Sequence, residues 1–103
     1  MRALLIAVTA LIPGSVLAQD VGDPARGLAY ARQACGECHA TELGEQGDSF
    51  LGVPSFQEIA NTTGMSEIAL ISFFQTPHPS MPNLIVPADD ARDVIAYILS
   101  LKR

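Results

Sequence analysis

The chain has few basic residues and few cysteines, and each shortage argues against a class of protein. Its 6 Lys and Arg stand against 11 Asp and Glu, for a net charge of −5, so it lacks the basic surface that nucleic-acid binding needs. Its two cysteines, Cys35 and Cys38, have no second Cys-x-x-Cys or histidine pair to complete a four-ligand zinc site. A disulfide between them would close a very short loop and add little stability. No βαβ pattern surrounds them, which argues against a thioredoxin-like dithiol.

One apolar run, residues 3–12, is too short to cross a bilayer, which takes about 20 residues. It follows Arg2 and is followed by a Pro-Gly break and then by Val16-Leu17-Ala18, with small residues at the −3 and −1 positions of a signal-peptidase site. We therefore predict a signal peptide over residues 1–18, export to the periplasm and a single small domain over residues 19–103. An uncleaved membrane anchor is the alternative, whereas cleavage would leave no stable membrane insertion. Loss of Arg2 would make the exported domain one charge more negative.

The two cysteines belong to the segment Cys35-Gly36-Glu37-Cys38-His39. Cys-x-x-Cys-His is the attachment site of a c-type haem. Thiols three residues apart lie along one side of a turn and can add to the two vinyl groups of a porphyrin. The histidine that follows then lies under the iron as a proximal ligand. The motif predicts one covalently bound haem c per chain, linked through Cys35 and Cys38. A small domain of this kind should fold only with its haem.

The spacing of apolar residues predicts an all-α protein with four helices and no convincing strand. Asp23 and Pro24 are suited to cap and open the first helix, and Ser55 with Glu58 reads as a capping box for the second. Gly27 inside the first helix costs about 1 kcal/mol relative to alanine and suggests close approach of another backbone. The predicted helices are residues 24–35, 55–61, 66–75 and 88–101.

A haem iron bound by His39 has a second axial position, for which the sequence offers Met81, Met65, His78 or no protein ligand. Met81 lies in a loop with prolines on both sides, which lowers the entropic cost of holding its side chain. Met65 is better explained as a filler of the core, and His78 as a surface histidine. We therefore predict His39 and Met81 as the iron ligands, a pairing that raises the reduction potential and blocks small-molecule binding.

At this point the chain from residue 19 onward closely resembles the small class I cytochromes c of bacteria. The resemblance implies the class I cytochrome c fold, with three to four helices packed around one covalently bound haem. It implies haem thioethers at Cys35 and Cys38 and axial ligands at His39 and Met81. The family also has a proline whose carbonyl orients the proximal imidazole, and Pro54 is the nearest match. The residues that carry the resemblance are Gly27 in the first helix, the Cys35–His39 motif, Met81-Pro82 and Val94-Ile95-Ala96-Tyr97-Ile98 in the last helix.

The chain departs from the family in two details. Val86 stands before Pro87, where the family usually has a serine or threonine cap, so a weaker or displaced cap is expected. Tryptophan is absent, so the haem propionates lack a tryptophan partner. The resemblance also implies that the first and last helices cross, with Gly27 permitting the approach and Tyr97 packing at the crossing.

These features predict a monomeric periplasmic carrier that moves one electron between larger redox proteins and is not an enzyme. Acidic residues close to the haem motif in sequence, Glu37, Glu42, Glu45 and Asp48, favour partners with a basic docking patch. A merely solvated acidic loop explains them equally well. Two other functions stay open: a permanent haem subunit of a dehydrogenase or oxidase complex, and a haem protein that binds a small ligand at an open sixth position.

Overall fold

The structure is a computed structural model, and it describes residues 9–11, 22–76, 81 and 85–103. The predicted signal peptide therefore lies almost entirely outside the described residues. The described part of the chain contains four α-helices and no strand, which confirms the predicted all-α class. A single antiparallel bridge between Asp48 and Val53 closes a loop. None of the helices in these ranges is long and apolar enough to cross a membrane. The helices are α1 (Pro24–Ala34), α2 (Phe56–Asn61), α3 (Glu67–Gln75) and α4 (Ala88–Ser100).

Three of the four helices begin at a side-chain cap. The Asp23 carboxylate accepts a hydrogen bond from the amide of Ala25 at the start of α1. Ser55 and Glu58 form the predicted capping box of α2, in which each side chain accepts from the other residue's backbone amide. Helix α4 has Pro87 at its N-cap position and no side-chain cap, as the missing serine or threonine predicted. Local sequence signals therefore account for where these helices start.

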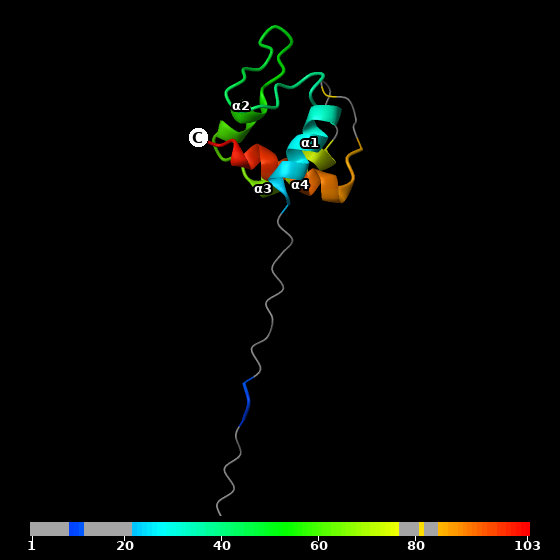
Figure 1. The fold of residues 1–103 in the computed structure, drawn as a ribbon. Coiled ribbons are helices and arrows are strands. Elements are labelled where there is room, and N and C mark those ends of the chain that lie inside the picture. Colours follow the sequence, from blue (N-terminus) through cyan, green and yellow to red (C-terminus); the bar gives the residue numbers. More distant parts are fainter. Residues whose placement is uncertain (1–8, 12–21, 77–80, 82–84) are drawn as a thin grey trace, which may run out of the picture.

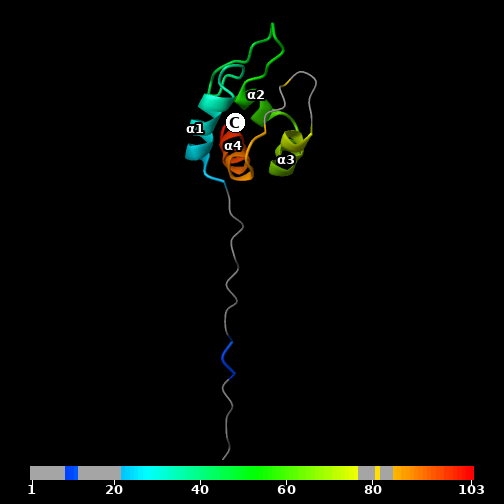
Figure 2. The same cartoon turned by 90° about the vertical axis from the view of Figure 1, so that its right-hand side faces the viewer.

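Helix α4 is the centre of the fold and contacts each of the other three helices. Figure 1 shows α1 crossing α4, and Figure 2 shows α4 lying between α1 and α3. At the crossing, a Cβ added to Gly27 would lie 2.0 Å from the carbonyl oxygen of Asp93 and 2.9 Å from Cβ of Tyr97. The two backbones therefore touch at a point where no side chain fits, as the glycine inside the helix suggested.

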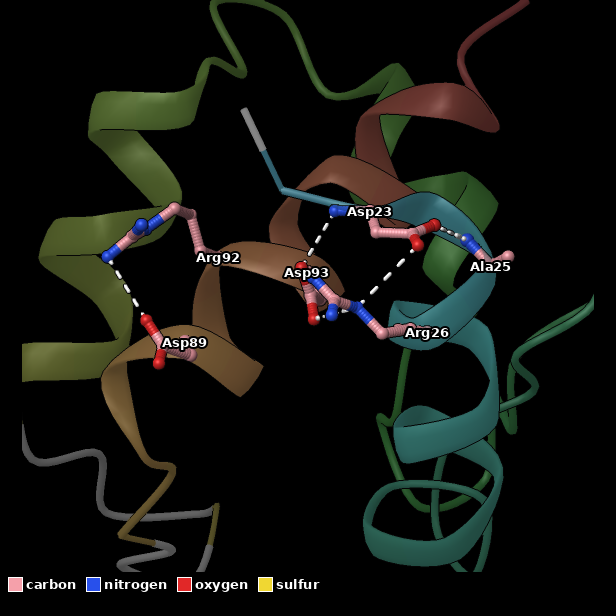
Figure 3. A network of polar contacts seen from close by, with 6 residues as sticks. All are labelled: Asp23, Ala25, Arg26, Asp89, Arg92 and Asp93. Atoms are coloured by element: carbon pink, nitrogen blue, oxygen red, sulfur yellow. Dashed lines mark hydrogen bonds and ion pairs between the residues drawn. The ribbon is translucent and has the colours of Figure 1, made fainter. Parts of the chain in front are cut away.

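Polar contacts among Asp23, Arg26 and Asp93 connect the beginning of α1 to α4 (Figure 3). Asp93 is buried, and its carboxylate accepts a hydrogen bond of 2.7 Å from the backbone amide of Asp23. The other carboxylate oxygen of Asp93 lies 3.2 Å from Nε of Arg26. These contacts give a buried carboxylate both a hydrogen bond and a cation, the conditions under which burying a charge is tolerated.

The hydrophobic core lies along α4, and the apolar residues Val94, Ile95, Tyr97, Ile98 and Leu101 of this segment are all buried. The buried apolar residues are Ala31, Phe56, Ala60, Leu70, Val94, Ile95, Tyr97, Ile98 and Leu101. The apolar residues of α3 are covered less completely, because Leu70 is buried whereas Ile68 is 76% exposed. This small core leaves apolar surface on α2 and α3 that the rest of the described chain does not cover.

Candidate haem-binding site

The Cys-x-x-Cys-His segment continues from the end of α1 as a series of tight turns. The amide of Cys35 donates to the carbonyl of Ala31 at 2.8 Å, and the amide of His39 donates to the carbonyl of Cys35 at 2.9 Å. The two cysteines form no disulfide with each other. Cys35 is half-buried, and this burial raises the pKa of its thiol, while Cys38 is exposed. The backbone thus holds two thiols and an imidazole within a segment of five residues.

The imidazole of His39 is oriented by a backbone carbonyl. Its Nδ1 lies 2.7 Å from the carbonyl oxygen of Pro54, and a carbonyl oxygen can only accept. Nδ1 therefore carries the proton and donates, which leaves the lone pair of Nε2 available to a metal. The ring also packs on Phe56, with centroids 5.5 Å apart and an angle of 49° between the planes. The carbonyl of Pro54 is the partner that the resemblance implied for the proximal histidine.

A cavity of about 370 Å³ brings together the residues predicted to form the site. Cys35, Cys38, His39, Pro54 and Met81 all line it. Apolar side chains from the loop before α2 and from α2, α3 and α4 form most of the remaining wall, including Leu51, Ile59, Leu70, Phe73, Phe74 and Ile98.

The structure does not single out Met81 among the two candidate methionines. Met65, interpreted from the sequence as a core filler, packs against the core and also lines this cavity. Met81 is half-buried. His78, the third candidate, lies outside the described residues.

A second, more open hollow of about 470 Å³ adjoins Cys38 and His39 and is lined by polar side chains. Three of the four acidic residues that the sequence placed near the haem motif, Glu42, Glu45 and Asp48, line it. Glu42 is engaged, because one of its carboxylate oxygens lies 2.6 Å from Nε of Arg32. Of the three acidic residues that line this hollow, Glu42 therefore forms an ion pair with Arg32, and the other two are Glu45 and Asp48.

Two further residues support the site, and sequence reasoning did not assign them this role. Oε2 of Glu58 accepts from the amide of Ser55 at 2.6 Å and from the amide of Gly47 at 3.1 Å. These hydrogen bonds, chiefly those from Ser55, lower the pKa of Glu58. The hydroxyl of Tyr97 donates to the carbonyl of Thr41, two residues beyond His39, at 2.5 Å. The capping-box pattern signals only the link between Glu58 and Ser55.

The residues of the cavity fit a covalently attached haem. A free imidazole Nε2 and a methionine thioether are suitable iron ligands, and the thiols of Cys35 and Cys38 stand at the same wall. The surrounding wall is apolar, as a site for a flat apolar macrocycle requires. Leu51 and Phe73 at the wall are still 68% and 45% exposed in the protein chain, so a bound group would cover apolar surface that the polypeptide leaves in water.

No protein-family model matches the chain, and no solved structure matches it. A curated protein does: cytochrome c-552 of Bradyrhizobium diazoefficiens is 35% identical over 98 residues, which cover 95% of this chain and 90% of the relative. Identity at this level over almost the whole length shows the family. The chain belongs to the class I monohaem c-type cytochromes.

Proposed function

We propose that this chain is a periplasmic electron carrier with one haem c, joined by thioethers to Cys35 and Cys38. The observation that carries the proposal is the convergence of Cys35, Cys38, His39 and Met81 on one apolar cavity in a chain related to a c-type cytochrome. When bound, the haem iron alternates between the ferrous and ferric states and so stores one electron. The protein supplies the ligands, their orientation and the apolar surroundings that tune this exchange.

In the proposed site, His39 and Met81 would hold the haem iron. Pro54 fixes the plane and the tautomer of His39 through the 2.7 Å hydrogen bond at Nδ1. The soft thioether of Met81 favours the ferrous iron and occupies the position that a small ligand would need. These two effects suit an electron carrier and oppose chemistry on a small oxidant.

We propose that the partners are larger redox proteins with a basic docking patch, met transiently by a monomeric carrier. The net charge of −5 and the carboxylates of Glu45 and Asp48 beside Cys38 and His39 support this. Electron transfer to such a partner should slow as salt is added, since screening weakens attraction between exposed charges. Export predicts a mature chain that begins at Gln19, which sequencing of the N-terminus of the periplasmic protein would test.

Replacing each methionine in turn tests the ligand assignment. Met81→Ala should lower the reduction potential and allow the ferrous protein to bind carbon monoxide, while Met65→Leu, a volume-conserving control, should leave both unchanged. The opposite pattern would assign the ligand to Met65. If the unaltered protein already binds carbon monoxide readily, the sixth position is open and the carrier assignment is wrong.

A further inference from the structure

One peptide group joins His39 to the carboxylate of Glu58. The carbonyl of Pro54 accepts from Nδ1 of His39 at 2.7 Å. The next amide, that of Ser55, donates to Oε2 of Glu58 at 2.6 Å. The carbonyl and this amide are the two halves of the planar Pro54–Ser55 peptide group, so they move and polarise as one unit. The chain of contacts therefore runs from imidazole to carbonyl, through the peptide plane, to a carboxylate.

Further hydrogen bonds fix the position of the Glu58 carboxylate. Oε2 also accepts from the amide of Gly47 at 3.1 Å, and the amide of Glu58 itself donates to the hydroxyl of Ser55 at 3.1 Å. A Cβ added to Gly47 would lie 2.4 Å from the carbonyl oxygen of Val53 and 2.5 Å from the amide nitrogen of Ser55. The loop is thus packed closely against the peptide group, and Ser55 is fully buried.

The charge state of Glu58 suits a role in this contact chain. The hydrogen bonds from Ser55 and Gly47 lower its pKa from the ordinary value of 4.5, so it is ionised at neutral pH. A hydrogen bond to an ionised acceptor is about twice as strong as one between neutral groups. Consecutive hydrogen bonds also polarise one another, which strengthens each member.

We propose that Glu58 is a positioning residue for the haem ligand His39 and acts on it through the Pro54–Ser55 peptide group. The negative carboxylate polarises the Pro54–Ser55 peptide group through the amide of Ser55, which makes the Pro54 carbonyl a stronger hydrogen-bond acceptor. The stronger hydrogen bond to Nδ1 then makes His39 a more basic ligand. A more basic ligand stabilises the ferric iron and lowers the reduction potential. This inference rests on the proposed function, because it concerns a histidine that binds haem iron.

A purely structural role for Glu58, as the capping residue of α2, makes a different prediction. Capping would affect stability and leave the electronic character of His39 unchanged. The two roles can be separated, because Glu58→Gln keeps an oxygen acceptor and removes the charge. Ser55→Ala does the reverse, since it removes the hydroxyl that caps α2 and keeps the Ser55 amide that donates to Glu58.

A third variant controls for the loss of one negative charge from the surface. Glu67 lies exposed in the first turn of α3, and no described hydrogen bond connects it to the loop that holds Pro54. Glu67→Gln therefore removes the same charge without touching the contact chain. Any general electrostatic effect on the potential should appear in both glutamine variants.

The experiment compares the unaltered holoprotein with the three variants by spectroelectrochemical titration and by NMR of the ferrous state. Glu58→Gln should raise the reduction potential more than Glu67→Gln does, and should shift the Nδ1 proton resonance of His39. Ser55→Ala should lower the melting temperature and move the potential less than Glu58→Gln. A Glu58→Gln variant with the potential of Glu67→Gln and an unmoved His39 resonance would overturn the proposal.

The unaltered protein provides a second test if Glu58→Gln does not mature. The amide proton of Ser55 should resonate far downfield and exchange slowly with solvent, since it donates to a carboxylate from a buried position. An upfield, rapidly exchanging amide would show that the contact chain is not formed. A purified protein without covalent haem would refute the proposed function. A normal holoprotein in which Glu58→Gln changes neither the potential nor the His39 resonance, relative to Glu67→Gln, would refute only the proposed role of Glu58.

Discussion

Replacing Gly27 with alanine should destabilise the protein, although alanine is the better helix former. Helix propensity alone favours the substitution by about 1 kcal/mol. The crossing of α1 and α4 opposes it, because the new Cβ would lie 2.0 Å from the carbonyl oxygen and 2.5 Å from the carbonyl carbon of Asp93. These are backbone atoms of a helix and cannot rotate away as a side chain would. Alanine at this position therefore has to push the two helices apart.

The size of the effect follows from the distance. An unstrained carbon–oxygen contact is about 3.5 Å, so α1 and α4 would have to separate by about 1.5 Å at the crossing. Overpacking of this kind costs about 3 kcal/mol at the upper end of the usual range, and the gain in helix propensity offsets about 1 kcal/mol. The net loss is about 2 kcal/mol, or a fall in melting temperature of about 8–16 °C for a domain of this size.

Thermal and denaturant unfolding of the oxidised holoprotein would measure this loss. The matched control is Ala29→Gly, at an exposed position of the same helix, which should cost only the propensity difference of about 1 kcal/mol. The two substitutions are opposite in chemistry, and we expect both to destabilise. A Gly27→Ala protein as stable as the unaltered one, or more stable, would refute the close crossing.

Three further predictions concern buried or charged contacts. Tyr97→Phe should lower the free energy of unfolding by about 1–2 kcal/mol, because the buried carbonyl of Thr41 loses its donor; an unchanged denaturant midpoint would contradict this. The pKa of Glu58 is lowered on folding, so its stabilising effect is complete above the ordinary value and is lost as pH falls through the folded value. Unfolding measured against pH should show this acid step in the native protein and not in Glu58→Gln, and identical profiles would contradict it. Asp93→Ala should cost about 1–3 kcal/mol by leaving the amide of Asp23 without its acceptor, whereas Asp93→Asn should cost less. Equal losses in urea titrations of the two variants would refute that role for the hydrogen bond.

The helices could be predicted from the sequence because their signals are local. Asp23 followed by Pro24, and Ser55 followed by Glu58, are caps read within four residues, and both are present. The helical spacing of apolar residues in α4 and the glycine inside α1 are also local signals, and the structure shows a buried apolar face and a close helix crossing there. These features need no knowledge of which distant segments meet.

The contacts that complete the site depend on segments that the fold brings together. Tyr97 and Thr41 are 56 positions apart, and no local pattern pairs them. Glu58 was predicted as a capping residue, but its bond to Gly47 requires the conformation of the whole loop. Asp93 accepts a hydrogen bond from the amide of Asp23, 70 positions earlier in the chain, and no local pattern indicates this contact. Pairing of His39 with Pro54 was implied by the resemblance to a family rather than by any spacing.

We propose that His39 and Met81 are the ligands of a low-spin haem iron held by Cys35 and Cys38. The optical spectrum of the purified protein in both oxidation states tests it most directly. We predict a low-spin c-type spectrum in which the oxidised form shows the weak near-infrared charge-transfer band of a sulfur–iron bond. A high-spin spectrum, or a low-spin spectrum without that band, would contradict the claim and remove methionine from the iron.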